Sequence, residues 1–252
     1  MDWRRAKSIL IFSFLLLNLL LGYQLWLDIR EQFDASVTTA ELPPETQSIM
    51  KEKRIQLKAS LPVETPALQD VTYRYKADGP PEARVKHELA EPVDSKVIFS
   101  PVKDMLKALS GQIPDLAKYE YDPNVRSDKV FVLYRMNEGL PMFKVKLELY
   151  YSNQKITSYS QDTAELTGTV KGKQEQVLPA SKVAANLIEN HLADGAIITN
   201  IRLGYHGQIF DSETQLAAPS WRVLLDSGDI YYVHAISGKV VKDNDAPEAE
   251  RP

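Results

Sequence analysis

The run FKVKLELYY at residues 143–151 decides the fold, because its apolar and polar side chains alternate along its length. Successive side chains of a β-strand point to opposite faces, so this pattern predicts a strand with one buried face. Residues 129–136 and 155–162 predict a strand on either side, with turns at 137–141 and 152–153. The three runs together predict an antiparallel meander.

A helix precedes this meander, and the same order of elements returns later in the chain. Ser100 is a suitable N-cap, Pro101 suits the first helical position and Gly111 ends the helical pattern. A second helix is predicted over 180–192, followed by strands at 196–205, 220–225, 230–235 and 239–241. The repeated order predicts an α+β fold of two similar lobes, each an antiparallel β-meander covered by a helix.

Residues 8–27, SILIFSFLLLNLLLGYQLWL, contain no charged side chain. Twenty helical residues rise about 30 Å, the thickness of the hydrocarbon core of a bilayer. Arg4, Arg5 and Lys7 precede this segment, so the positive-inside rule predicts a single-pass protein of the cell membrane with a cytoplasmic N-terminus and an extracellular C-terminal domain. A cleaved signal peptide is disfavoured, since the residues after Leu21 are bulky and offer no small-x-small cleavage site.

The predicted transmembrane helix carries an amide side chain near its middle. Phe14, Asn18 and Gly22 follow one another at four-residue spacing and share one helix face. A small residue beside a polar one allows another helix to approach closely and form a hydrogen bond, which makes this face a candidate partner-binding surface. The alternative, that the strongly apolar segment merely tolerates Asn18, stays open.

These patterns divide the chain into six segments. We expect a cytoplasmic tail at 1–7, the transmembrane helix at 8–27, a membrane-proximal helical and extended segment at 28–95, the first α+β lobe at 96–170, the second α+β lobe at 171–242 and a disordered tail at 243–252. Within 28–95, a helix is expected over 45–58 and a strand over 71–75.

The sequence offers little support for catalysis, and we expect no catalytic residues, no metal and no cofactor. There is no cysteine, which excludes disulfides and thiol chemistry. The four histidines lack zinc-site spacing, and we interpret His191, on the apolar face of a predicted helix, and His234 as structural. No nucleophile elbow, phosphate loop or dinucleotide fingerprint is present, and a net charge of −4 argues against nucleic acid as a partner.

The opening MDWRRAKSILIF at residues 1–12, joined directly to an anchor that contains Asn18, resembles the YycI (WalI) family of low-GC Gram-positive bacteria. The stretch 221–241, WRVLLDSGDIYYVHAISGKVV, shares this resemblance. It also looks like the end of a PepSY-type module, although His234 stands where that module commonly has Asp.

The resemblance implies a regulatory function. Proteins of the YycI family act with a sister anchored protein, YycH, on the sensor histidine kinase WalK (YycG), which controls cell-wall metabolism, and contact in the family runs largely through transmembrane helices. The family has no catalytic residues. Two alternatives stay open: a PepSY-like inhibitor or chaperone of an exported peptidase or cell-wall hydrolase, and a wall enzyme with an unrecognised site.

Overall fold

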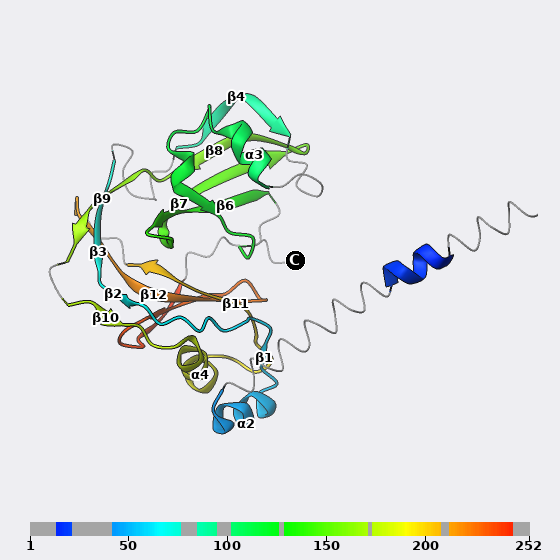
Figure 1. Cartoon of the computed structure of the whole chain (residues 1–252), viewed down its shortest axis with the longest axis vertical. Helices are drawn as coiled ribbons and strands as arrows, with labels where there is room; N and C mark the ends of the chain where they lie inside the picture. Colours follow the sequence, from blue (N-terminus) through cyan, green and yellow to red (C-terminus); the bar gives the residue numbers. More distant parts are fainter. Residues whose placement is uncertain are drawn as a thin grey trace, which may run out of the picture.

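The structure is a computed structural model that describes residues 14–21, 42–76, 85–94, 102–125, 129–170, 173–207 and 212–243 (Figure 1). Residues 14–21 are helical. The elements that follow are α2 (Pro44–Glu52), β1 (Gln56–Leu57), β2 (Ala67–Leu68), β3 (Val71–Tyr75), β4 (His87–Asp94), α3 (Val102–Leu109), η2 (Leu116–Lys118), β5 (Tyr119–Tyr121), β6 (Val130–Asn137), β7 (Leu140–Ser152), β8 (Lys155–Gln161), β9 (Ala164–Thr169), β10 (Glu175–Gln176), α4 (Ala180–Asn190), β11 (Ile197–His206), β12 (Gln215–Leu225), β13 (Ile230–His234) and β14 (Val240–Asp243).

Twelve of the described strands form one sheet, with β14-β13-β12-β11-β7-β6-β5 as its main path. β8 pairs with β7 and β4, while β3 pairs with both β9 and β12. The pairings are antiparallel except those of β11 with β7 and with β1. The α+β prediction is confirmed only in part, because the described chain is mostly a largely antiparallel β-sheet with few helices.

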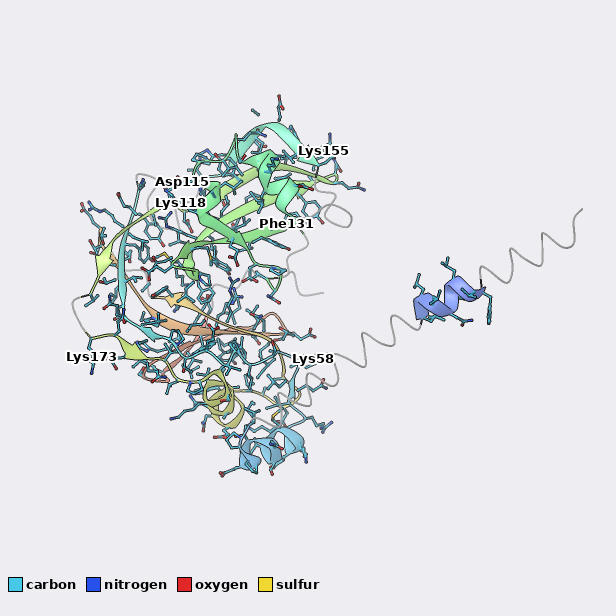
Figure 2. All side chains as sticks on the ribbon, in the orientation of Figure 1. Lys58, Asp115, Lys118, Phe131, Lys155 and Lys173 are labelled. Atoms are coloured by element: carbon cyan, nitrogen blue, oxygen red, sulfur yellow. The ribbon has the colours of Figure 1, made fainter. Side chains whose placement is uncertain are left out.

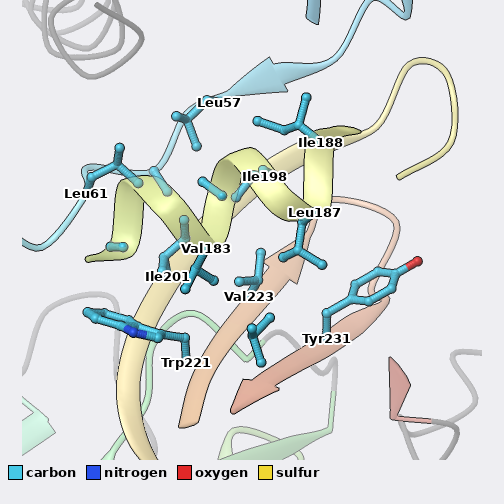
Figure 3. Packing of buried hydrophobic residues seen from close by; sticks show 14 of the residues in the cluster. Leu57, Leu61, Val183, Leu187, Ile188, Ile198, Ile201, Trp221, Val223 and Tyr231 are labelled. Carbon is cyan, nitrogen blue, oxygen red and sulfur yellow. The ribbon is translucent and has the colours of Figure 1, made fainter. Parts of the chain in front are cut away.

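Helix α4 covers the face of β11, β12 and β13 (Figure 3). Val183, Leu187 and Ile188 project from one side of α4 because their spacing matches the helical period. They join Trp221 and Val223 in one hydrophobic cluster, and the indole of Trp221 donates a hydrogen bond of 2.9 Å to the Leu178 carbonyl just before the helix. We call α2, β1, α4 and β11–β14 the α4 half.

A second hydrophobic cluster lies beneath α3. Leu109 of α3 and Leu147 and Leu149 of β7 belong to it, and none of the three has exposed surface. The alternation read at residues 143–151 places these β7 leucines on one face of the sheet, as predicted. We call α3, η2 and β4–β8 the α3 half. Figure 2 labels Phe131 and Lys155 in this half, and Lys58 just after β1 of the α4 half.

The prediction of two similar lobes, each a β-meander covered by a helix, is not confirmed, because the strands of both halves belong to a single sheet. Tyr205 of β11 pairs in parallel with Met142 of β7, and this contact joins the two meanders. Tyr205 and Ala217, near the adjacent ends of the long strands β11 and β12, lie in the hydrophobic cluster of the α3 half. The α4 half thus extends into the core of its neighbour.

The segment expected to be membrane-proximal contributes to both halves. Met50 of α2 and Leu57 of β1 lie in the cluster of the α4 half, and β4 pairs with β8 in the α3 half. The helix expected over 45–58 is shorter: it ends at Glu52, because Arg54 adopts a left-handed φ of 56° and β1 begins at Gln56.

Of the predicted transmembrane helix, only residues 14–21 are described. Within the described ranges, no helix is both long enough and apolar enough to cross a membrane. Positions 8–13 and 22–27 of that prediction, and most of the expected disordered tail, lie outside the described residues.

The junction between β11 and β7 leaves no room for a side chain at Gly204. A Cβ there would lie 2.5 Å from the Pro141 carbonyl oxygen and 2.7 Å from the ring of Phe143. We therefore expect Gly204→Ala to lower the free energy of unfolding by about 1–3 kcal/mol, since backbone and a packed ring must both shift. Chemical denaturation measures this change.

Gly111→Ala is the matched control, because a Cβ at Gly111 would meet nothing within 4 Å. Equal effects of the two substitutions would contradict the close approach of the two strands.

Candidate functional site

The helix at residues 14–21 presents an apolar surface that no other described residue covers. Its seven large apolar side chains are between 51% and 66% exposed, and Asn18 is exposed among them. Phe14 and Asn18 share a face by helical spacing, whereas Gly22, the third residue of the predicted partner-binding face, lies outside the described residues. This surface is one candidate site.

A buried charged pair joins the two halves at a second place. The Nη2 atom of Arg222, on β12, donates a hydrogen bond of 2.6 Å to the Oδ2 atom of Asp122, which follows β5. Both side chains have 0% exposure. Taking two charges out of water is costly, so the pair adds little net stability to the folded chain. Its main effect is that it requires one specific geometry of the two side chains.

Aromatic rings of the α3 half lie against the Arg222 guanidinium. The guanidinium carbon is 5.4 Å from the ring centroid of Tyr134 and 4.8 Å from that of Phe143. Among the described residues, no acceptor bonds its Nε or Nη1 atom. Burial opposes its charge, but Tyr134 and Asp122 outweigh this effect, so the pKa of Arg222 is raised and the group stays a cation.

Further ion pairs surround this buried contact. Arg202 of β11 lies 2.7 Å from Glu120 and 3.6 Å from Asp122, both of the α3 half. Elsewhere along the same boundary, Lys144 of β7 lies 3.4 Å from Asp243 of β14. Each of these contacts links one half to the other.

A small hydrophobic cluster completes the boundary. It consists of Val132, Tyr134, Phe143, Leu224, Ile230 and Tyr232. The first three come from β6 and β7, and the last three from β12 and β13. We call this cluster, with Asp122, Arg222, Arg202 and Glu120, the boundary layer.

His206 lies at the edge of the boundary layer and stacks on Tyr232 with 3.7 Å between ring centroids. Its Nε2 atom is buried, although the residue as a whole keeps some exposure. Burial lowers the pKa of His206 from 6.5 to about 4; Lys144 lowers it further and Asp243 opposes the shift. His206 is therefore neutral at pH 7.

Of the two histidines interpreted as structural from the sequence, the structure confirms one prediction and contradicts part of the other. His234 accepts hydrogen bonds at Nδ1 from the backbone N–H groups of Ile236 and Ser237, which fixes the turn after β13 and confirms its structural role. The burial expected for His191 is wrong: α4 ends at Asn190, so His191 caps the helix and is exposed.

Sequence reasoning missed Arg222, Asp122 and His206. A signal existed for Arg222, because it stands inside the apolar run 221–225, and a charge inside a buried strand needs a partner. Nothing local identifies Asp122 as that partner. The described residues contain no group of three or more His, Cys, Asp or Glu side chains that could hold a metal ion.

Comparison with known proteins links the chain to one family. The model of a family described as "YycI protein" matches residues 35–236. No curated protein matches the chain. Among solved structures, the chain is similar to an uncharacterized protein from Eubacterium rectale, with 9% identity and a TM-score of 0.41, over 75% of this chain and 86% of that one.

The lowered pKa of His206 makes stability depend on pH. The unfolded chain binds this proton at a pKa near 6.5, and the folded chain only at a pKa near 4. The contribution of His206 to the free energy of unfolding is therefore complete above pH 6.5 and falls as the pH drops toward 4. We expect a loss of up to about 3 kcal/mol from this group over that interval. Denaturation of the parent and of His206→Phe, which keeps the stacked ring, measures it.

His87→Phe is the matched control, since His87 is an exposed histidine that also stacks on a tyrosine, Tyr159. The His87→Phe variant should still lose stability between pH 6.5 and pH 4, and His206→Phe should lack most of this loss. An unchanged pH profile in His206→Phe would refute this assignment.

Proposed function

This chain belongs to the YycI protein family, and from this membership we propose that it is a membrane-anchored regulator of a sensor histidine kinase of the WalK type. In this proposal the chain acts together with a YycH-type partner. Its C-terminal domain lies outside the cell, and its output is the control of cell-wall metabolism.

Family membership carries the regulatory role, and the structural observation that supports the membrane anchor is the bare apolar surface of residues 14–21. Seven large apolar side chains that stay exposed on the helix at residues 14–21 need a non-aqueous environment or a protein partner, because exposure of each to water costs about 1.5–3 kcal/mol. A bilayer supplies that environment. The uncharged stretch 8–27, with basic residues before it, supports the same location.

The face that carries Asn18 suits contact with another transmembrane helix. In hydrocarbon an amide gains from an interhelical hydrogen bond, and Gly22 four residues later would let the second helix come close. A helix that prefers one signalling state of the kinase shifts the balance toward that state. A differential contact of about 1–3 kcal/mol changes this balance about 5- to 150-fold.

Asn18→Leu tests the helix contact without changing the anchor. Loss of an interhelical hydrogen bond worth about 1–2 kcal/mol should weaken association about 5- to 30-fold. The measurement is quantitative co-purification of the kinase and the YycH-type partner from membranes, together with the transcription of wall-metabolism genes.

Leu20→Ala is the matched control, because Leu20 lies two positions from Asn18 and hence on the opposite side of the helix. Replacement of residues 8–27 by an unrelated apolar helix extends the test to the whole segment. If both Asn18→Leu and the replaced helix keep full association, contact through the membrane helix is refuted.

A further inference from the structure

The hydrophobic cluster between the two halves is smaller than the cluster inside either half. Among the described residues, the clusters of the α4 half and the α3 half hold 21 and 16 buried hydrophobic residues, whereas the cluster between them holds six. Most residues of each large cluster come from one half, although Tyr205 and Ala217 of the α4 half belong to the cluster of the α3 half, and the boundary layer contains the smallest of the three clusters.

At one end the halves are joined by backbone pairing. β11 pairs with β7 at Tyr205, and β3 pairs with β12 at one of its edges and with β9 at the other. Figure 1 shows β3 and β9 along one side of the molecule, between the two halves. These pairings and the core positions of Tyr205 and Ala217 make this end a continuous connection.

At the other end the halves are held by side chains. Along β12, Arg222 lies five positions, about 17 Å, from Ala217 of the β3–β12 pairing, and three positions, about 10 Å, from Pro219, which pairs with Tyr205. There the contact is the Arg222–Asp122 pair with Arg202 and Glu120 beside it. The backbone connection and the charged contact therefore lie about 10–17 Å apart along β12.

The α4 half also holds the first element described after the helix at 14–21. The Thr46 hydroxyl of α2 donates to Glu189 of α4 at 2.5 Å, and Lys53 Nζ lies 3.3 Å from the carbonyl oxygens of both Ile188 and Glu189. These contacts bind α2 to the end of α4. The N-terminal segment therefore leads into the α4 half, so a motion of the α3 half is described relative to the α4 half.

We propose that the α3 half opens and closes against the α4 half about the β11–β7 and β3–β12 pairings, and that the buried Arg222–Asp122 pair is the latch that holds the closed state. Opening exposes the boundary layer while both cores stay intact. The closed state is specific because Asp122 must meet Arg222 in one geometry, and it is reversible because the apolar contact beneath is small. This device does not depend on the proposed kinase partner and is a property of the chain alone.

Thiol accessibility in the full chain in detergent micelles tests the proposal, since the chain has no cysteine of its own. Three conservative substitutions place one thiol in each buried cluster: Val132→Cys in the boundary layer, Val145→Cys in the α3 half and Val183→Cys in the α4 half. Opening without unfolding should let a maleimide modify the Val132→Cys thiol at least about tenfold faster than the other two. Similar rates at all three positions would overturn the proposal.

The latch is tested by Asp122→Asn in the same three backgrounds. Asparagine keeps the acceptor that bonds the Asn124 N–H at 3.0 Å but removes the charge that faces Arg222. The Val132→Cys rate should rise about tenfold further while the Val145→Cys and Val183→Cys rates stay constant. If all three rates rise together, or none does, the pair does not act as a latch.

Discussion

One buried ion pair determines how the two halves of this chain meet. Asp122 and Arg222 have no exposed surface, so each would be a costly lone charge without the other. Because each charge needs the other, the pair favours the one arrangement of the α3 half on the α4 half that brings them together. The small hydrophobic cluster beneath them could tolerate several arrangements, since apolar contacts have no preferred direction. The pair therefore supplies specificity at a boundary where apolar burial is limited.

Much of the fold could be predicted because its signals are local. The alternation at 143–151 gave β7, and β8, α4, β11 and β13 begin or end within two residues of their predicted bounds. The single sheet could not be predicted, because the pairing of Tyr205 with Met142 joins segments with no sequence signal in common. The two-residue strand β1 was missed for the same reason, since it exists only through its pairing with β11.

The two candidate sites differ in how much of each can be predicted from the sequence alone. The apolar surface of residues 14–21 follows from composition alone, and the structure leaves it uncovered by described residues. The boundary layer depends on partners far apart: Arg222 and Asp122 are separated by 100 positions. Sequence can indicate that a charge inside a buried strand needs a partner, but only the fold identifies that partner. The same holds for His206, whose pKa depends on burial that the sequence does not reveal.

A double-mutant cycle on the unfolding free energy of the full chain in detergent micelles tests the central claim most directly. Asp122→Leu and Arg222→Met should each cost about 3–5 kcal/mol, because each leaves one buried charge without its partner. The double variant should cost less than the sum by at least about 2 kcal/mol. Strictly additive costs would contradict the account, because they would mean that the two side chains do not depend on each other.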